Sequence, residues 1–188
     1  MSASGADPRD EIVIHIPALR AFAISLTRNP TAADDLVQDT IVKAWSKIDR
    51  FTAGTDLRAW LFTILRNTFF SDRRKVRREV PDPDGLHAAT LSVKPDHDSR
   101  IAFSEFLKAF NVLSPEHREV LILVGANGYS YAEAADMMGV ATGTVKSRAN
   151  RARSRLCELL GMSGTDDDQA RADGATFAVV LRSGLSLA

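Results

Sequence analysis

Apolar residues recur at helical spacing over two long stretches of this chain, and strand-like alternation is scarce. The first stretch ends near Arg78, and the second begins near Phe103. Between them, residues 79–99 are rich in proline and acidic side chains. About twenty such residues inside one compact domain would be unusual, so they are interpreted as a linker. The pattern therefore predicts an all-α protein of two small helical domains joined by a flexible segment.

The length and composition agree with this division. A chain of 188 residues has room for two small domains, and a hydrophobic content of 45% supports packed cores. The predicted parts are an N-terminal tail (1–11), a first domain (12–78), an acidic linker (79–99), a second domain (100–161) and a C-terminal tail (162–188).

Three amphipathic helices are expected in the first domain. Pro17 suits the first turn of the first helix, and the Asn29-Pro30 pair ends it. Thr31 is then the expected N-cap of the second helix, with Asp34 completing a capping box. The expected apolar face of the second helix carries Val37, Ile41, Ala44, Trp45 and Ile48. The third helix carries Leu57, Trp60, Leu61, Ile64, Leu65 and Phe69.

Helix start and stop signals are clearest in the second domain. Ser114, followed by a proline, is a typical N-cap, and Ser130 with Glu133 makes a capping box. Gly139 predicts a sharp break, after which Thr142 is expected to cap a long final helix. A short helix, a glycine turn and a longer basic helix form the pattern of a helix-turn-helix.

The residues at the predicted turn have mechanical roles that suit this motif. Ala135 is small where the two helices approach each other, and Gly139 permits a tight backbone turn. Val145 is expected to point back into the apolar wedge between the helices. The sequence therefore predicts DNA binding by this pair of helices.

Charge is unevenly distributed, although the formal net charge is zero. Residues 66–78 contain six basic side chains and one acid, and residues 142–155 contain five basic side chains and no acid. Residues 79–99 contain five acids and one lysine. Two basic stretches divided by an acidic one indicate two contacts with anions. A single basic stretch could equally be the solvated face of a helix.

Donor side chains share the outer face of the last predicted helix. The base-reading candidates at helical spacing are Lys146, Ser147, Asn150 and Arg151. Three further arginines could reach phosphates: Arg148, Arg153 and Arg155. The alternative is an ordinary helical hairpin with a basic solvent face.

Aromatic residues alternate with cations in the first basic stretch. The aromatic residues are Phe51, Trp60, Phe69 and Phe70, and the polar ones are Arg66, Asn67, Arg73, Arg74, Lys75, Arg77 and Arg78. Such a mixture suits single-stranded nucleic acid, because bases stack on rings while cations follow the backbone. Trp60 and Phe69 could instead belong to the core, whereas Phe51, beside a Thr-Ala-Gly-Thr loop, is the better candidate for exposure.

Three segments together resemble the extracytoplasmic-function sigma factors of bacteria. Residues 35–45 (DLVQDTIVKAW) resemble the family's polymerase-docking helix, and residues 55–67 (TDLRAWLFTILRN) resemble its promoter-opening region. Residues 143–153 (GTVKSRANRAR) resemble its recognition helix. The match covers roughly residues 12–160 with the segments in the family's order. Residues 121–131 are similar to the general-stress subgroup of alphaproteobacteria.

The resemblance assigns roles to particular positions. It implies docking on the β′ coiled coil of RNA polymerase by Asp35, Leu36, Gln38, Asp39 and Trp45. It implies reading of the −10 element, with a base flipped from the duplex, by Phe51, Thr55, Trp60, Asn67, Arg73 and Arg74. It implies reading of the −35 element by Thr144, Lys146, Ser147, Arg148, Asn150, Arg151 and Arg155. The β flap of polymerase and an anti-sigma protein are further implied partners.

Catalysis, a cofactor, a metal site and a small-molecule substrate are not expected. The four histidines are scattered without metal-ligand spacing, and no Gly-x-Ser-x-Gly motif is present. The single cysteine, Cys157, excludes an intramolecular disulfide, fits a reducing cytoplasm and is expected to pack in the core. No apolar run approaches the length of a membrane span, so a cytoplasmic protein is expected.

Two other functions fit part of the sequence. A helix-turn-helix regulator that acts without polymerase would not need the docking-like segment 35–45. A sigma-like module that only sequesters an anti-sigma protein would not need the basic face of residues 142–155.

Overall fold

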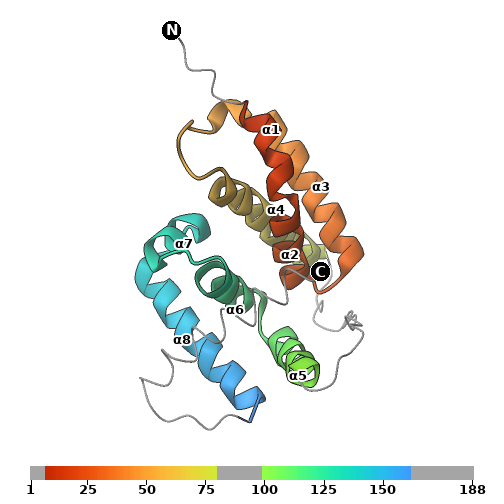
Figure 1. Cartoon of the computed structure of the whole chain (residues 1–188), viewed down its shortest axis with the longest axis vertical. Coiled ribbons are helices and arrows are strands. Elements are labelled where there is room, and N and C mark those ends of the chain that lie inside the picture. The colour runs from red at the N-terminus through yellow and green to blue at the C-terminus, as the bar shows by residue number, and fades with distance from the viewer. Residues whose placement is uncertain (1–6, 80–98, 162–188) are drawn as a thin grey trace. The chain divides into compact units, whose positions relative to one another are not determined.

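The computed structural model describes residues 7–79 and 99–161, and every regular element within these ranges is helical. The chain divides into two compact units, residues 1–89 and 90–188, which are treated separately below (Figure 1). The predicted all-α fold of two helical units is confirmed. Most of the predicted linker and all of the predicted C-terminal tail lie outside the described residues.

Within residues 7–79, the first unit has six helical elements. In chain order they are α1 (Pro8–Ile12), η1 (Val13–His15), α2 (Ile16–Thr27), α3 (Pro30–Ser46), η2 (Ile48–Arg50) and α4 (Leu57–Glu79). Part of the predicted N-terminal tail is therefore helical. Asp7 caps α1, because its carboxylate accepts a hydrogen bond from the Arg9 backbone N–H at 2.9 Å, and this bond lowers the pKa of Asp7.

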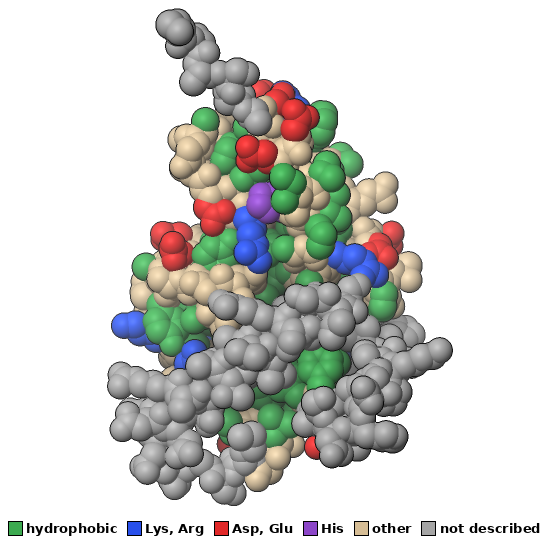
Figure 2. Space-filling model, viewed as in Figure 1, with side chains coloured by type: hydrophobic (Ala, Val, Ile, Leu, Met, Phe, Trp, Pro, Cys, Tyr) green, Lys and Arg blue, Asp and Glu red, His purple; other side chains and the backbone are tan. Residues whose placement is uncertain are grey.

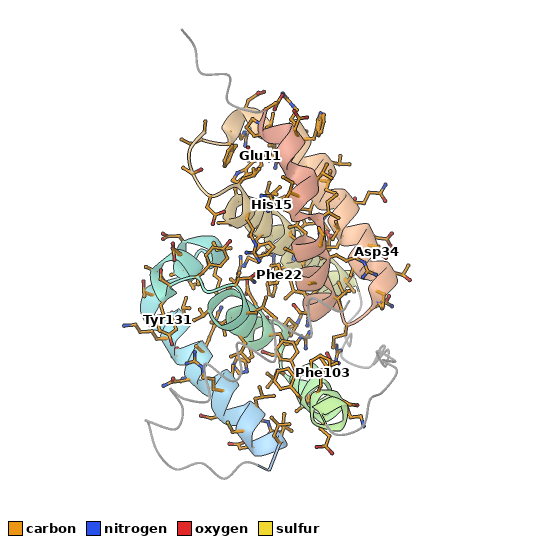
Figure 3. All side chains as sticks on the ribbon, in the orientation of Figure 1. Glu11, His15, Phe22, Asp34, Phe103 and Tyr131 are labelled. Carbon is orange, nitrogen blue, oxygen red and sulfur yellow. The ribbon has the colours of Figure 1, made fainter. Side chains whose placement is uncertain are left out.

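The core of the first unit lies between α2, α3 and α4, which pack against one another pairwise (Figure 1). Phe22 of α2 and Phe62 of α4 are each 1% exposed, and their ring centroids are 4.9 Å apart (Figure 3). Burial of one such aromatic side chain stabilises a fold by about 1.5–3 kcal/mol. The predicted core positions Leu57, Leu61 and Leu65 are also buried.

The predicted start of α3 at Thr31 is wrong by two residues. Asn29 is the N-cap, and its side-chain oxygen accepts a hydrogen bond from the Ala32 backbone N–H at 3.1 Å. The reason is Pro30, whose ring fixes a helical φ and disfavours helical geometry in the residue before it. Asn29 is accordingly extended, and Thr31 already lies inside the helix.

The predicted apolar face of α3 is correct for Val37 and Ala44 and wrong for Trp45, which is 54% exposed. The helix ends at Ser46, and buried Ile48 belongs to the short helix η2. Ile48 therefore keeps the helical spacing of the apolar face although α3 has already ended. Trp45 faces solvent on the last turn instead of packing in the core.

Within residues 99–161, the second unit has five helical elements. They are α5 (Ser99–Val112), α6 (Pro115–Val120), the π-helical turn η3 (Leu121–Ala126), α7 (Tyr131–Met138) and α8 (Thr142–Leu159). Its core includes Phe106 and Phe110 of α5, Leu121 of η3 and Leu156 of α8. Cys157 is only partly buried, at the edge of this core.

A buried arginine stabilises the junction between α5 and α6. Arg118 is 2% exposed, and its guanidinium donates to the backbone carbonyls of Leu113 and, at 3.5 Å, Asn111. The carbonyl groups at the end of α5 therefore gain a donor inside the protein. Ser114 caps α6 as predicted, accepting a hydrogen bond from the His117 backbone N–H at 3.3 Å.

The predicted N-cap of α8 at Thr142 is wrong by one residue. Ala141 occupies the cap position in extended geometry, and its carbonyl accepts from the Thr144 N–H at 2.8 Å. Thr142 is the first helical residue, so no side chain caps this helix. None of the helices described in 7–79 and 99–161 is long and apolar enough to cross a membrane.

Candidate nucleic-acid interface

Helices α7 and α8 form the predicted helix-turn-helix geometry. Gly139 ends α7 with φ +64°, a left-handed conformation that glycine adopts without steric cost. Ala135 is 3% exposed and Val145 is fully buried, so both fill the wedge between the helices. The sequence correctly identified all three residues of this turn.

The donor side chains predicted to read bases all lie on the exposed surface of α8. Lys146, Ser147, Asn150 and Arg151 are exposed, whereas Val145 and Ala149 beside them are buried. The Ser147 hydroxyl donates to the Thr144 carbonyl at 2.9 Å, which leaves its oxygen free to accept from a base. Residues 142–155 contain no acid, so this face is positively charged along its length.

The three arginines predicted to reach phosphates differ in their surroundings. Arg148 is partly buried. Arg153 donates from Nη1 to the Tyr131 hydroxyl at 3.2 Å, which ties α8 to the first turn of α7 (Figure 3). Arg155 makes an exposed ion pair with Glu158 at 2.8 Å. An exposed pair of this kind contributes only about 0–1 kcal/mol, so Arg155 can exchange Glu158 for a phosphate.

A capping box fixes the start of α7. The Ser130 side chain accepts from the Glu133 backbone N–H at 3.2 Å, and the Glu133 carboxylate accepts from the Ser130 N–H at 2.7 Å. The hydrogen bonds from Ser130 lower the pKa of Glu133, because they favour the ionised carboxylate. The predicted capping box is confirmed.

In the first unit, an aromatic pair joins the loop before α4 to the helix itself. The Phe51 and Trp60 ring centroids are 5.4 Å apart, and both side chains are partly buried. Phe51 is therefore less exposed than the sequence suggested. The loop turns at Gly54, which has φ +87°, and the hydroxyl of exposed Thr55 donates to the Thr52 carbonyl at 2.7 Å.

Along α4, cations lie directly over aromatic rings. The Arg66 guanidinium is 4.9 Å from the Phe70 ring centroid, and that of Arg73 is 6.0 Å from Phe69. Such contacts hold the arginines beside the rings on which bases could stack. Arg66 also donates to the Asn67 side-chain oxygen at 3.0 Å, and Asn67, Arg73 and Arg74 are exposed.

The predicted docking residues on α3 fall on two faces of the helix. Asp35, Gln38, Asp39 and Trp45 are exposed and available to a partner. Leu36 is 8% exposed, so its predicted place at a docking surface is corrected. Its side chain is buried in the first unit, one helical position away from exposed Asp35, and contributes to the core.

The exposed face of α3 continues into an apolar strip that the sequence interpretation missed. Val42 is 62% exposed and Val13 of η1 is 64% exposed. The Arg9 guanidinium lies 5.8 Å from the Trp45 ring centroid, and Arg20 pairs with Asp34 at 2.7 Å.

These two contacts hold the chain from α1 to α2 antiparallel to α3. Hydrophobic side chains gather on this part of the unit (Figure 2). The signal in the sequence was the spacing of Val42, which lies three residues after Asp39 and three before Trp45 and therefore shares their helical face.

Both helical units match known protein families. Residues 12–79 match the Sigma-70 region 2 family, and residues 103–156 match the Sigma-70, region 4 family. The chain belongs to the extracytoplasmic-function sigma factors, because a member of that family is 54% identical to it over 85% of its length. These are transcription initiation factors that direct core RNA polymerase to promoters. The predicted family is thereby confirmed.

Individual relatives agree with this family. The sigma factor is 54% identical over 159 residues to the ECF RNA polymerase sigma factor EcfG of Rhodopseudomonas palustris, covering 85% of this chain and 88% of that protein. It is 31% identical over 148 residues to the RNA polymerase sigma factor CarQ of Myxococcus xanthus, covering 78% and 85%.

A solved structure shows the same fold. The sigma factor RpoE of Bartonella quintana, crystallised with the anti-sigma factor NepR, is 50% identical with a TM-score of 0.70, covering 82% of this chain and 97% of that one. These matches support the general-stress subgroup predicted from the sequence.

Proposed function

We propose that the two units of this sigma factor read the two elements of a promoter while α3 holds the chain on core polymerase. The exposed, acid-free donor face of α8 carries this proposal, because its four candidate base-reading side chains all face solvent on one side of the helix. In this assignment the protein has no catalytic activity of its own and works in the cytoplasm.

The −35 element is assigned to α8. Lys146, Ser147, Asn150 and Arg151 contact base edges in the major groove, and each good contact contributes about 1–3 kcal/mol of discrimination. Thr144, Arg148 and Arg155 contact the backbone and fix the register of the helix. The Tyr131–Arg153 hydrogen bond keeps α8 at a fixed angle to α7 while the groove is occupied.

The −10 element is assigned to the loop before α4 and to α4 itself. Phe51 and Thr55 border the place for a flipped base. The contact of the Phe51 ring with Trp60 holds the Phe51 side chain in position there. Asn67 hydrogen-bonds a base, and Arg73 and Arg74 follow the separated strand. Flipping costs a few kcal/mol of stacking, which the contacts with the flipped base must offset.

The docking surface on α3 is assigned to the β′ coiled coil of polymerase. Asp35, Gln38 and Asp39 give its first half an acidic character, and Val42 and Trp45 give its second half an apolar one. A helix of the partner fits such a face, with basic side chains toward the aspartates and apolar ones toward Trp45. The second unit makes the remaining contact, with the β flap.

An anti-sigma partner is proposed by analogy with the Bartonella protein, which was crystallised with NepR. A protein that covers the docking face of α3 and the basic face of α8 would block polymerase and DNA together. Stress-response genes are then the proposed targets of the released sigma factor.

The −35 assignment is tested with Lys146→Ala and Arg151→Ala. Each variant should lower the affinity of the holoenzyme for a −35 duplex about 5- to 150-fold, as expected for one lost base contact. Affinity for core polymerase should not change, because α8 is not assigned to docking. Lys108→Ala, at an exposed position of α5 outside the helix-turn-helix, is the matched control and should bind like the original protein. Equal loss of DNA binding and core binding in the Lys146 and Arg151 variants would remove support for this site.

A further inference from the structure

His117 lies in the first turn of α6, beside the helix that carries the recognition face. α6 packs against α8, and the partly buried His117 interacts electrostatically with Arg148 and Arg151 there. These arginines are three residues apart and share one side of α8. Three basic side chains from two helices therefore meet at the edge of the recognition face.

The cluster has little compensating negative charge. Burial lowers the pKa of His117 below its ordinary 6.5; Glu116 opposes this shift, and the guanidiniums of Arg148 and Arg151 reinforce it. Of the other elements in contact with α6, η3 contains no ionisable side chain, and α5 contacts Arg118 through the backbone carbonyl of Asn111. Without a bound anion, the imidazole is therefore held in its neutral form near pH 7.

An anion bound among these groups would favour the protonated form of His117 over the neutral one. Protonated imidazole donates from both ring nitrogens, and each guanidinium adds further donors. A phosphate oxygen accepts charge-assisted hydrogen bonds from all three side chains and removes the repulsion between them. Because Arg151 also belongs to the proposed base-reading face, the nearest phosphate is one on the DNA backbone at the border of the groove.

We propose that His117, Arg148 and Arg151 together bind one backbone phosphate of −35 DNA, and that protonation of His117 tightens this contact as the pH falls. This proposal rests on the assignment of α8 to the −35 element. The sign follows from linkage: bound phosphate raises the pKa of His117, so DNA binding takes up a proton. The added affinity is absent above the pKa of the bound protein and complete below that of the free protein.

The test measures binding of the holoenzyme, formed from the full-length chain and core polymerase, to a fluorescent −35 duplex at pH 7.5 and 5.5 and at several salt concentrations. After the change seen in His117→Gln is subtracted, the original protein should bind up to about threefold more tightly at pH 5.5 than at pH 7.5. At pH 5.5 its salt slope should be steeper than that of His117→Gln by about 0.9, the value for one phosphate contact.

Two variants complete the experiment. His117→Lys carries a permanent charge and should bind tightly with no loss between pH 5.5 and 7.5, which tests the site even if His117→Gln is unstable. His15→Gln changes a histidine of the first unit and should keep the original pH dependence. Equal pH dependence and equal salt slopes in the original protein and His117→Gln would overturn the phosphate site. Absence of duplex binding by every protein at both pH values would overturn the −35 assignment itself.

Discussion

In both units, a residue in the core and a residue at an interface can be direct neighbours in the chain. On α3, exposed Asp35 precedes buried Leu36, and on α8, fully buried Val145 precedes exposed Lys146. Because neighbouring residues point about 100° apart on a helix, a motif of consecutive letters always mixes the two roles. A family motif therefore names a segment, and burial decides which of its side chains can touch a partner.

The Glu133 carboxylate in the capping box of α7 makes the stability of the helix-turn-helix depend on pH. The lowered pKa of Glu133 means that its carboxylate stabilises the fold above its unfolded pKa and that this contribution disappears as the pH falls through the folded pKa. The loss therefore lies below the ordinary glutamate value of 4.5.

Glu133→Gln should lose less stability than the original protein between pH 6.5 and 3.5, because the amide does not titrate. Thermal unfolding at the two pH values measures the difference. Asp136→Asn, an exposed acid on the same helix, is the control and should keep the original profile. An identical loss of stability in the original protein and Glu133→Gln would contradict the role of the capping box.

Helix starts and turns could be predicted from the sequence where one residue type alone satisfies the backbone. Gly139 is such a case, because φ +64° strains other residues, and so is the Ser130–Glu133 capping box. The start of α3 could have been predicted by the rule that places Ser114 before its proline, because Pro30 favours Asn29 over Thr31 as the N-cap.

Helical spacing alone leaves the face of Trp45 undecided, because Trp45 lies one position, about 100°, beyond buried Ala44 at the border of the apolar face. Part of the candidate site could be predicted, because the spacing of the donor side chains along α8 already places them on one exposed side of the helix. The electrostatic contact of His117 with α8 depends on tertiary packing and has no local signal.

The turn between α7 and α8 gives a prediction with a matched pair of glycines. Gly139→Ala should destabilise the second unit by about 1–2 kcal/mol, because a left-handed conformation strains any side chain. An added Cβ meets no atom within 4 Å there, so the cost is conformational and not steric.

Gly143→Ala also meets open space but lies in α8 without a positive φ, so it should stabilise the helix by up to about 1 kcal/mol. Urea unfolding monitored by circular dichroism measures both. Equal effects of the two substitutions would contradict the left-handed turn.

For the whole molecule, the zero net charge fits a factor that binds promoters in company with polymerase. Each unit presents one modest basic surface, and acidic residues elsewhere balance the total. Two weak contacts on one chain gain strength through effective concentration once a partner fixes their separation. The free protein is therefore expected to bind promoter DNA much more weakly than the holoenzyme does, with a difference that shrinks at low salt.

Transcription in vitro with purified core polymerase and a promoter library tests the central claim most directly. The account predicts that this chain added to core polymerase starts transcripts at a subset of promoters that core alone does not use, and that Lys146→Ala reduces those starts without loss of core binding. A chain that binds core polymerase yet starts no transcript from any promoter would contradict the account and favour a module that only sequesters an anti-sigma protein.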